Sequence, residues 1–258
     1  MGEARRISVI MPVHNEADYL PTCLKSLKAI EECFFEFIFV IDRCTDNSEA
    51  IVREWFPNAT IIRKTTCSWK HSIAENYQIG LEQSSGELIC THDADATSPQ
   101  NILPLLQRLK GNVASVSAEV VTWKEASILN RLNYYWDKTR SFAPLGEEPR
   151  GAFRLIRKDA IEKIGGFKDS PAQETILDIE FRRAGFQSII VKGVISYHLR
   201  KVSLAKAIRS QLSAGQTRRQ LGISALRVVG HGVIRLRPFV LWGYLLKRKG
   251  KSSDACWT

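Results

Sequence analysis

Short apolar runs alternate with helical patterns along the first 121 residues. Ile7–Val13 and residues 36–41 are apolar on both faces, which is typical of buried parallel strands. Between them Leu20, Leu24 and Leu27 recur at helical spacing. The same alternation predicts strands over 59–63, 87–91 and 113–121, and helices ending near 56 and spanning 71–84 and 98–110. This order predicts an α/β fold with an open, mainly parallel sheet and helices on both faces.

The alternation loosens after about residue 125. The pattern there predicts helices over 125–140, 159–164 and 172–184, and strands over 150–157, 189–191 and 194–197. Of the 37 Lys and Arg residues 13 lie after residue 199, with one acid, whereas residues 1–199 carry 24 basic and 26 acidic residues. We therefore expect a near-neutral body over 1–199 and a basic segment over 200–258. A uniformly basic nucleic-acid-binding protein is disfavoured.

Polar clusters follow three of the predicted strands, at residues 12–16, 42–48 and 93–97. Ligands of open α/β sheets bind outside the carboxyl ends of the strands. Asp93 and Asp95 are two residues apart, so an extended segment turns both carboxylates to one side. Two such carboxylates can share a hard divalent cation, whereas an isolated Asp-x-Asp is more often a surface turn. Their place at a strand end favours the cation site.

Three further side chains are candidates for this chemistry. Glu174 and Asp178 lie four apart on a predicted helix and share a face, which indicates either a solvated acidic face or a general base. His198 ends the last predicted strand of the body. It is either a structural histidine or a third metal ligand, since imidazole suits ions such as Mn²⁺.

The basic segment combines cations with interrupted apolar runs. Residues 202–221 fit an amphipathic basic helix, and 233–246 form a 14-residue apolar run that contains Arg235 and Arg237. A spanning helix needs about 20 apolar residues, so we expect no simple transmembrane anchor. Trp242, Tyr244 and the cations favour an interfacial segment on an anionic membrane over a helix pair packed on the body. With no visible signal peptide, we expect a cytoplasmic protein, peripheral on the inner face of the cell membrane.

The ordered motifs resemble family 2 glycosyltransferases, the inverting enzymes with a GT-A fold. The resemblance spans residues 7–198, about three-quarters of the chain. It is carried by VIMPVHNE (9–16), DRCTDNS (42–48), DAD (93–95), GAFR (151–154), GGF (165–167) and ETILDIEFRRAG (174–185). Three departures are visible. The family often has a second Asp beside Asp42, where Arg43 stands, and an Asp after the catalytic Glu, where Thr175 stands. The neighbourhood of Lys70 also lacks the glycine and arginine that are common in the family.

The resemblance implies a nucleotide-sugar donor, whose nucleoside is lined by Pro12, His14, Glu16 and Asp42. Residues 93–95 (Asp93, Ala94, Asp95) would flank the diphosphate and hold Mg²⁺ or Mn²⁺ through the two aspartates, with His198 as the further candidate ligand. Glu174 or Asp178 would be the base of a one-step inverting displacement. The basic segment suits a polyprenyl phosphate or a lipid-linked glycan as acceptor.

Two other kinds of function compete with this one. A nucleotidyltransferase of the same fold is disfavoured, because residues 12–16 contain an acid and no glycine. The main alternative is a protein without catalytic activity, either a non-catalytic relative with the GT-A fold or a protein that binds anionic surfaces or nucleic acid through residues 200–258. No nucleic-acid partner is expected for the leading reading.

Overall fold

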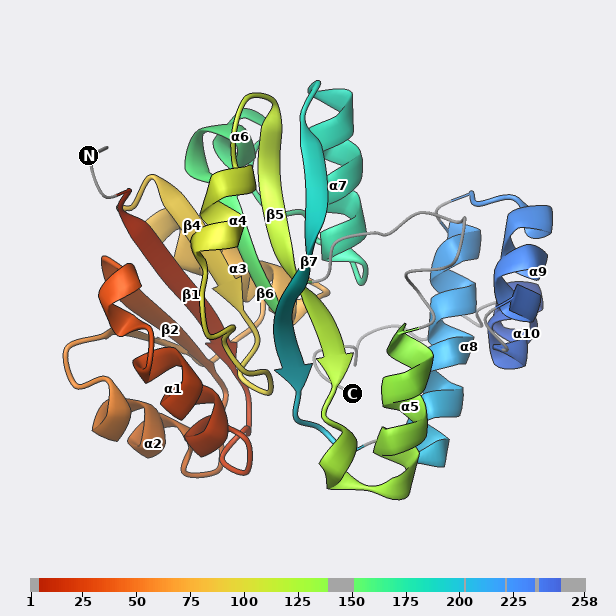
Figure 1. The fold of residues 1–258 in the computed structure, drawn as a ribbon, viewed down its shortest axis with the longest axis horizontal. Helices are drawn as coiled ribbons and strands as arrows, with labels where there is room; N and C mark the ends of the chain where they lie inside the picture. The colour runs from red at the N-terminus through yellow and green to blue at the C-terminus, as the bar shows by residue number, and fades with distance from the viewer. Residues whose placement is uncertain (1–4, 139–150, 202, 221, 235–236, 247–258) are drawn as a thin grey trace. The chain divides into compact units, whose positions relative to one another are not determined.

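The computed structural model describes residues 5–138, 151–201, 203–220, 222–234 and 237–246 (Figure 1). Arg235, one of the predicted cations within the last apolar run, lies outside the described residues, as does Val202 at the start of the predicted basic helix.

Seven strands form one sheet in the order β3-β2-β1-β4-β6-β5-β7. They are β1 Ile7–Val13, β2 Glu36–Asp42, β3 Thr60–Lys64, β4 Leu88–His92, β5 Val113–Thr122, β6 Phe153–Arg157 and β7 Gln187–His198. β1 runs parallel to β2 and β4, and β2 runs parallel to β3. The predicted open, mainly parallel α/β sheet is therefore confirmed, with one antiparallel strand, β6, between β4 and β5.

Both faces of the sheet are covered by helices, as Figure 1 shows. The first layer contains α1 (Leu20–Lys28), α2 (Ser48–Trp55) and α4 (Leu103–Arg108), and the second contains α3 (Ser72–Gln83), α6 (Lys158–Lys163) and α7 (Gln173–Arg183). Neighbouring strand residues face opposite layers, since Val9 joins the first core cluster and Ile10 the second. This explains why β1 carries apolar residues on both of its faces.

The predicted start of α4 is wrong. Ser98 and Pro99 were expected at the beginning of a helix, but α4 begins at Leu103 and has Pro104 in its first turn. Ser98 is used by tertiary contacts instead, because its Oγ lies 2.8 Å from Nε2 of His92 and its backbone N–H donates to Oγ of Ser26 at 2.8 Å. These bonds hold the segment after β4 as a loop.

The predicted last two strands are one. β7 runs without a break from Gln187 to His198 and contains Gly193 at a φ of +82°. A glycine is suited to this left-handed backbone conformation, since it carries no Cβ. Gly193 therefore alters the backbone conformation at one position, and the strand continues beyond it.

The described residues divide into two compact units, one within 5–121 and 151–199 and the other within 122–138 and 200–246. The second unit contains α5 (Ile128–Lys138), α8 (Leu204–Gln220), α9 (Ala225–Ile234) and α10 (Pro238–Leu245). None of the described helices has the length and apolar character needed to cross a membrane.

Candidate active site

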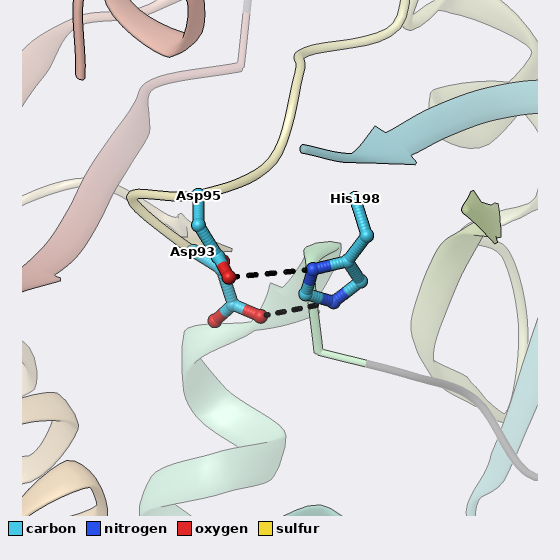
Figure 2. A group of neighbouring side chains, drawn as sticks. All are labelled: Asp93, Asp95 and His198. Atoms are coloured by element: carbon cyan, nitrogen blue, oxygen red, sulfur yellow. Dashed lines mark ion pairs between the residues drawn. The ribbon is translucent and has the colours of Figure 1, made fainter. Parts of the chain in front are cut away.

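The turn after β4 brings two carboxylates next to a histidine from the end of β7. Ala96 and His198 form an isolated antiparallel bridge, and the backbone N–H of Leu199 donates to the carbonyl of Asp95 at 2.8 Å. Nδ1 of His198 lies 3.5 Å from Oδ2 of Asp95, and Nε2 lies 4.0 Å from Oδ2 of Asp93 (Figure 2). One ligand atom from each of the three residues lies within 4.8 Å of the others. The fold thus assembles the predicted three-residue group.

This group fits a divalent cation. Carboxylate oxygens are the ligands of hard cations, and an imidazole nitrogen also suits Mn²⁺. Asp95 is buried, whereas Asp93 and His198 are partly exposed, so the group is in contact with solvent. Ala94, between the two aspartates, is buried in the apolar core.

Tyr77 of α3 orients Asp93. Its hydroxyl donates a 2.8 Å hydrogen bond to Oδ1 of Asp93, and its ring stacks on Phe167 at 5.4 Å. Burial raises the pKa of Tyr77 well above its usual value, and the charges of Asp93 and Glu174 raise it further. The hydroxyl therefore remains a donor, and the other oxygen of Asp93 faces His198. The sequence reading missed Tyr77, whose one signal was its place on the buried face of a helix.

Glu174 lies in the first turn of α7, against the backbone of Gly151. A Cβ on Gly151 would lie 2.0 Å from Oε1 of Glu174, so only glycine leaves room for this carboxylate. The residue after Gly151 is bonded to the turn that follows β4 and carries Asp93 and Asp95. The backbone N–H of Asp93 donates to the carbonyl of Ala152 at 3.1 Å. Glu174 is half-buried and acts on the pKa of Tyr77, which places its charge close to the same group of residues.

Asp178, one helical turn further along, has a different environment. It is 6% exposed, and its Oδ1 accepts a short hydrogen bond from Nη2 of Arg154, which is 1% exposed. Arg154 also donates to Ser115 at 2.5 Å and to Ser188 at 3.2 Å. A buried aspartate paired with a buried arginine joins α7 to β6 in this arrangement. An arginine within an otherwise apolar strand was the signal for this ion pair.

The predicted nucleoside residues lie at the carboxyl ends of β1 and β2. Pro12 is buried within β1, and Glu16 is 6% exposed, with its backbone N–H donating to Oγ of Ser48 at 2.8 Å. Nδ1 of His14 lies 2.6 Å from the backbone carbonyl oxygen of Asp42. The two strand ends are therefore tied together, and the predicted residues share one region of the sheet edge.

The side chain of Asp42 is fully buried in a polar cluster. Its Oδ2 accepts hydrogen bonds from Ser72 and, at 2.9 Å, from Nδ2 of Asn76, and its Oδ1 accepts one from Nε of Arg43 at 2.7 Å. Nζ of Lys64 lies 3.7 Å from the same carboxylate and pairs with Glu75 at 2.5 Å. These contacts hold Asp42 in one orientation. Lys64 and Glu75 were missed, although both are charged residues at the edge of apolar elements.

Comparison with known proteins agrees with this geometry. The family profile described as "Glycosyl transferase family 2" matches residues 8–165. The chain belongs to this family. Among curated relatives of this glycosyltransferase chain, the "Prophage bactoprenol glucosyl transferase homolog" of Escherichia coli K12 is 23% identical over 220 residues, covering 83% of this chain and 66% of the relative. The "Probable glycosyltransferase YdaM" of Bacillus subtilis 168 is 26% identical over 212 residues, covering 72% and 49%. The chain thus spans less than two thirds of their length.

Solved structures show the same GT-A fold. A mannosyltransferase from Pyrobaculum calidifontis, in complex with GDP-Man and Mn²⁺, matches with a TM-score of 0.67 at 20% identity and covers 93% of this chain and 72% of its own. Glucosyl-3-phosphoglycerate synthase from Mycobacterium tuberculosis, in complex with Mg²⁺ and UDP, matches with a TM-score of 0.57 at 17% identity, covering 85% and 80%. The fold expected from the motifs of this family 2 chain is confirmed.

Proposed function

We propose that this chain is a metal-dependent inverting glycosyltransferase that moves a sugar from a nucleotide-sugar donor to an acceptor hydroxyl or phosphate. The observation that carries the proposal is the group Asp93, Asp95 and His198, with Glu174 beside the same turn. It is supported by two solved structures of this fold, one bound to GDP-Man and Mn²⁺ and the other to UDP and Mg²⁺.

In this mechanism Asp93, Asp95 and His198 hold Mg²⁺ or Mn²⁺. The ion supplies Lewis-acid stabilisation of the charge on the departing nucleoside diphosphate. Tyr77 keeps Asp93 in its ligating orientation through the 2.8 Å hydrogen bond. Residues 93–95 would flank the diphosphate, with the buried Ala94 holding the two aspartates on the turn.

The nucleoside binds at the ends of β1 and β2, in the region of Pro12, His14, Glu16 and Asp42. Because Asp42 is fully buried, its carboxylate serves this region by holding Ser72 and Asn76 in place, and the His14 contact to the Asp42 carbonyl keeps the two strand ends together. This rigidity lowers the ordering cost of binding the donor.

Glu174 is the general base in this proposal. It is half-buried, and it lies beside the turn that carries Asp93, so it can accept the proton of an attacking hydroxyl. Asp178 is unsuited to the same task, because it is buried in an ion pair with Arg154. The hydroxyl oxygen bonds to the anomeric carbon as the bond to the nucleoside diphosphate breaks, and the configuration at that carbon inverts.

The proposed acceptor is a polyprenyl phosphate or a lipid-linked glycan on the cytoplasmic face of the membrane. Support comes from relatives named as bactoprenol glucosyl transferases, and from an undecaprenyl-phosphate sugar transferase of Proteus mirabilis that is 32% identical over 115 residues, or 39% of this chain. A phosphate monoester, with a second pKa of about 6, is deprotonated at neutral pH and needs no base. Glu174→Gln should therefore abolish transfer to hydroxyls but spare transfer to phosphates.

Metal-dependent hydrolysis of nucleotide sugars by the purified chain tests the proposal. A thermal-shift screen of nucleotide sugars with Mn²⁺ selects the donor, and Asp93→Asn combined with Asp95→Asn should abolish its hydrolysis and the Mn²⁺-dependent shift. Asp159→Asn is the matched control, since Asp159 is an exposed aspartate of α6 paired with Arg157. Unchanged hydrolysis in the double variant would overturn the proposal. Binding of residues 200–258 to anionic polymers without any donor binding would favour the alternative function.

A further inference from the structure

Helix α9 presents an apolar face to solvent. Leu226, Val229 and Val233 are 83%, 47% and 63% exposed, and their spacing of three and four residues places them on one side of the helix. The opposite side is packed, since Val228 is buried and Gly232 lies against the side chain of Leu241. The exposed side is therefore a continuous apolar stripe and not a set of scattered residues.

Helix α10 carries a second exposed apolar stripe. Trp242 and Leu245 are 65% and 75% exposed, and Leu246 follows at 42%. Val240 and Gly243, on the other side of the helix, are buried. We call the six residues of the two stripes the docking face (Leu226, Val229, Val233, Trp242, Leu245 and Leu246).

Backbone contact with α8 determines which side of α10 faces outward. A Cβ on Gly243 would lie 2.1 Å from the carbonyl oxygen of Leu212, and a Cβ on Gly215 would lie 2.1 Å from that of Val240. Two glycines thus let the helices touch, and α10 cannot turn its stripe inward without breaking this contact. Helix α8, which the sequence predicts as an amphipathic basic helix, packs against α10 through these glycines.

The segment that carries the docking face is rich in cations. Residues 200–246 contain nine Lys and Arg and no acid. Arg219 donates from Nη1 to the carbonyls of Tyr244 and Leu245 at 3.2 and 3.1 Å, which places its charge at the end of α10 beside the stripe. Arg227 follows Leu226 on α9 and is exposed. A second copy of this face would carry the same positive charge, which disfavours self-association.

We propose that the docking face inserts into the headgroup region of an anionic lipid bilayer. An anionic bilayer offers both an apolar interior for the stripes and negative charge for the surrounding cations. Trp242 suits the interface, since an indole combines an apolar ring with a polar N–H. That the bilayer also presents the acceptor rests on the proposed function, whereas the docking itself does not.

Vesicle flotation of the full chain tests the docking face. Wild-type protein should float with vesicles that contain phosphatidylglycerol and much less with pure phosphatidylcholine vesicles, and high salt should weaken binding. Leu226→Glu combined with Leu245→Glu should lower the partition coefficient at least tenfold, since burying each leucine contributes roughly a factor of ten or more. Leu103→Glu is the control, because Leu103 is 54% exposed in the other unit.

Three results would overturn the proposal. They are equal wild-type binding to neutral and anionic vesicles, unchanged binding of the double variant, and a wild-type dimer that the double variant dissociates. Donor hydrolysis without lipid separates this test from the proposed function. If the wild type does not hydrolyse the donor, the proposed transferase function is contradicted. If the double variant hydrolyses the donor but no longer floats with vesicles, docking is a property separate from catalysis.

Discussion

Gly151 leaves no room for a side chain beside Glu174. A Cβ at residue 151 would lie 2.0 Å from Oε1 and 2.8 Å from Cδ of Glu174. Non-bonded heavy atoms pack at about 3.5 Å, so in Gly151→Ala the carboxylate must move by more than about 1 Å. The residue has no left-handed backbone that would itself demand glycine. We therefore expect Gly151→Ala to act by displacing the carboxylate of Glu174.

The expected loss follows from this displacement. Moving a catalytic group by about 1 Å costs roughly a hundredfold in rate, or about 2.7 kcal/mol of transition-state stabilisation. The KM for the donor should change little, because the metal and nucleoside residues keep their positions. The melting temperature should also change little, since Glu174 is half-buried and can rotate toward solvent.

Donor hydrolysis, in which water takes the place of the acceptor, is the assay. It compares the wild type, Gly151→Ala, Glu174→Gln and the double variant. If alanine acts through Glu174, it costs about a hundredfold in the wild type and close to nothing in the Glu174→Gln background. A wild-type rate in Gly151→Ala, or the same loss in both backgrounds, would refute the reasoning.

Other residues of the site give further predictions. Tyr77→Phe keeps the stack on Phe167 but removes the hydrogen bond to Asp93, so calorimetry should show Mn²⁺ binding weakened roughly 10- to 100-fold; unchanged affinity contradicts this role. His198→Gln should weaken Mn²⁺ binding more than Mg²⁺ binding, because imidazole suits Mn²⁺ better, and equal losses would speak against ligation. Arg154→Met leaves the buried carboxylate of Asp178 without its ion-pair partner and should lower the free energy of unfolding, measured in urea, by about 3–5 kcal/mol. Adding Asp178→Leu to the same chain should largely restore it, and additive losses would contradict a buried pair.

Much of the sheet follows from local pattern. β1 occupies the residues that the apolar run predicts, and α3 and α7 lie within one or two residues of their predicted bounds. These elements are recognisable because burial on one or both faces imposes a periodicity on consecutive residues. The start of α4 was not recognisable, because Ser98 is a good helix cap by itself and its use by His92 and Ser26 depends on distant parts of the chain.

The antiparallel strand β6 shows a second limit of local pattern. Its apolar residues predict a strand, but they carry no information on direction or on neighbours. β6 pairs with β4 and β5 because the chain returns between them, with Cys90 opposite Leu155 and Leu155 opposite Val116. This insertion brings Gly151 and Ala152 to the metal-site turn, and so brings Glu174 there as well.

The sequence alone determined the α/β class, the family motifs and the chemical character of the candidate site. It indicated Asp93 and Asp95 as a pair because two residues of one extended segment share a side. Only the tertiary structure decided that His198, about a hundred residues later, joins the group, and that Asp178 is buried against Arg154 while Glu174 is half-buried. The physical reason is that periodicity reports the burial of neighbours along the chain, whereas ion pairs and metal sites depend on which distant strand ends meet.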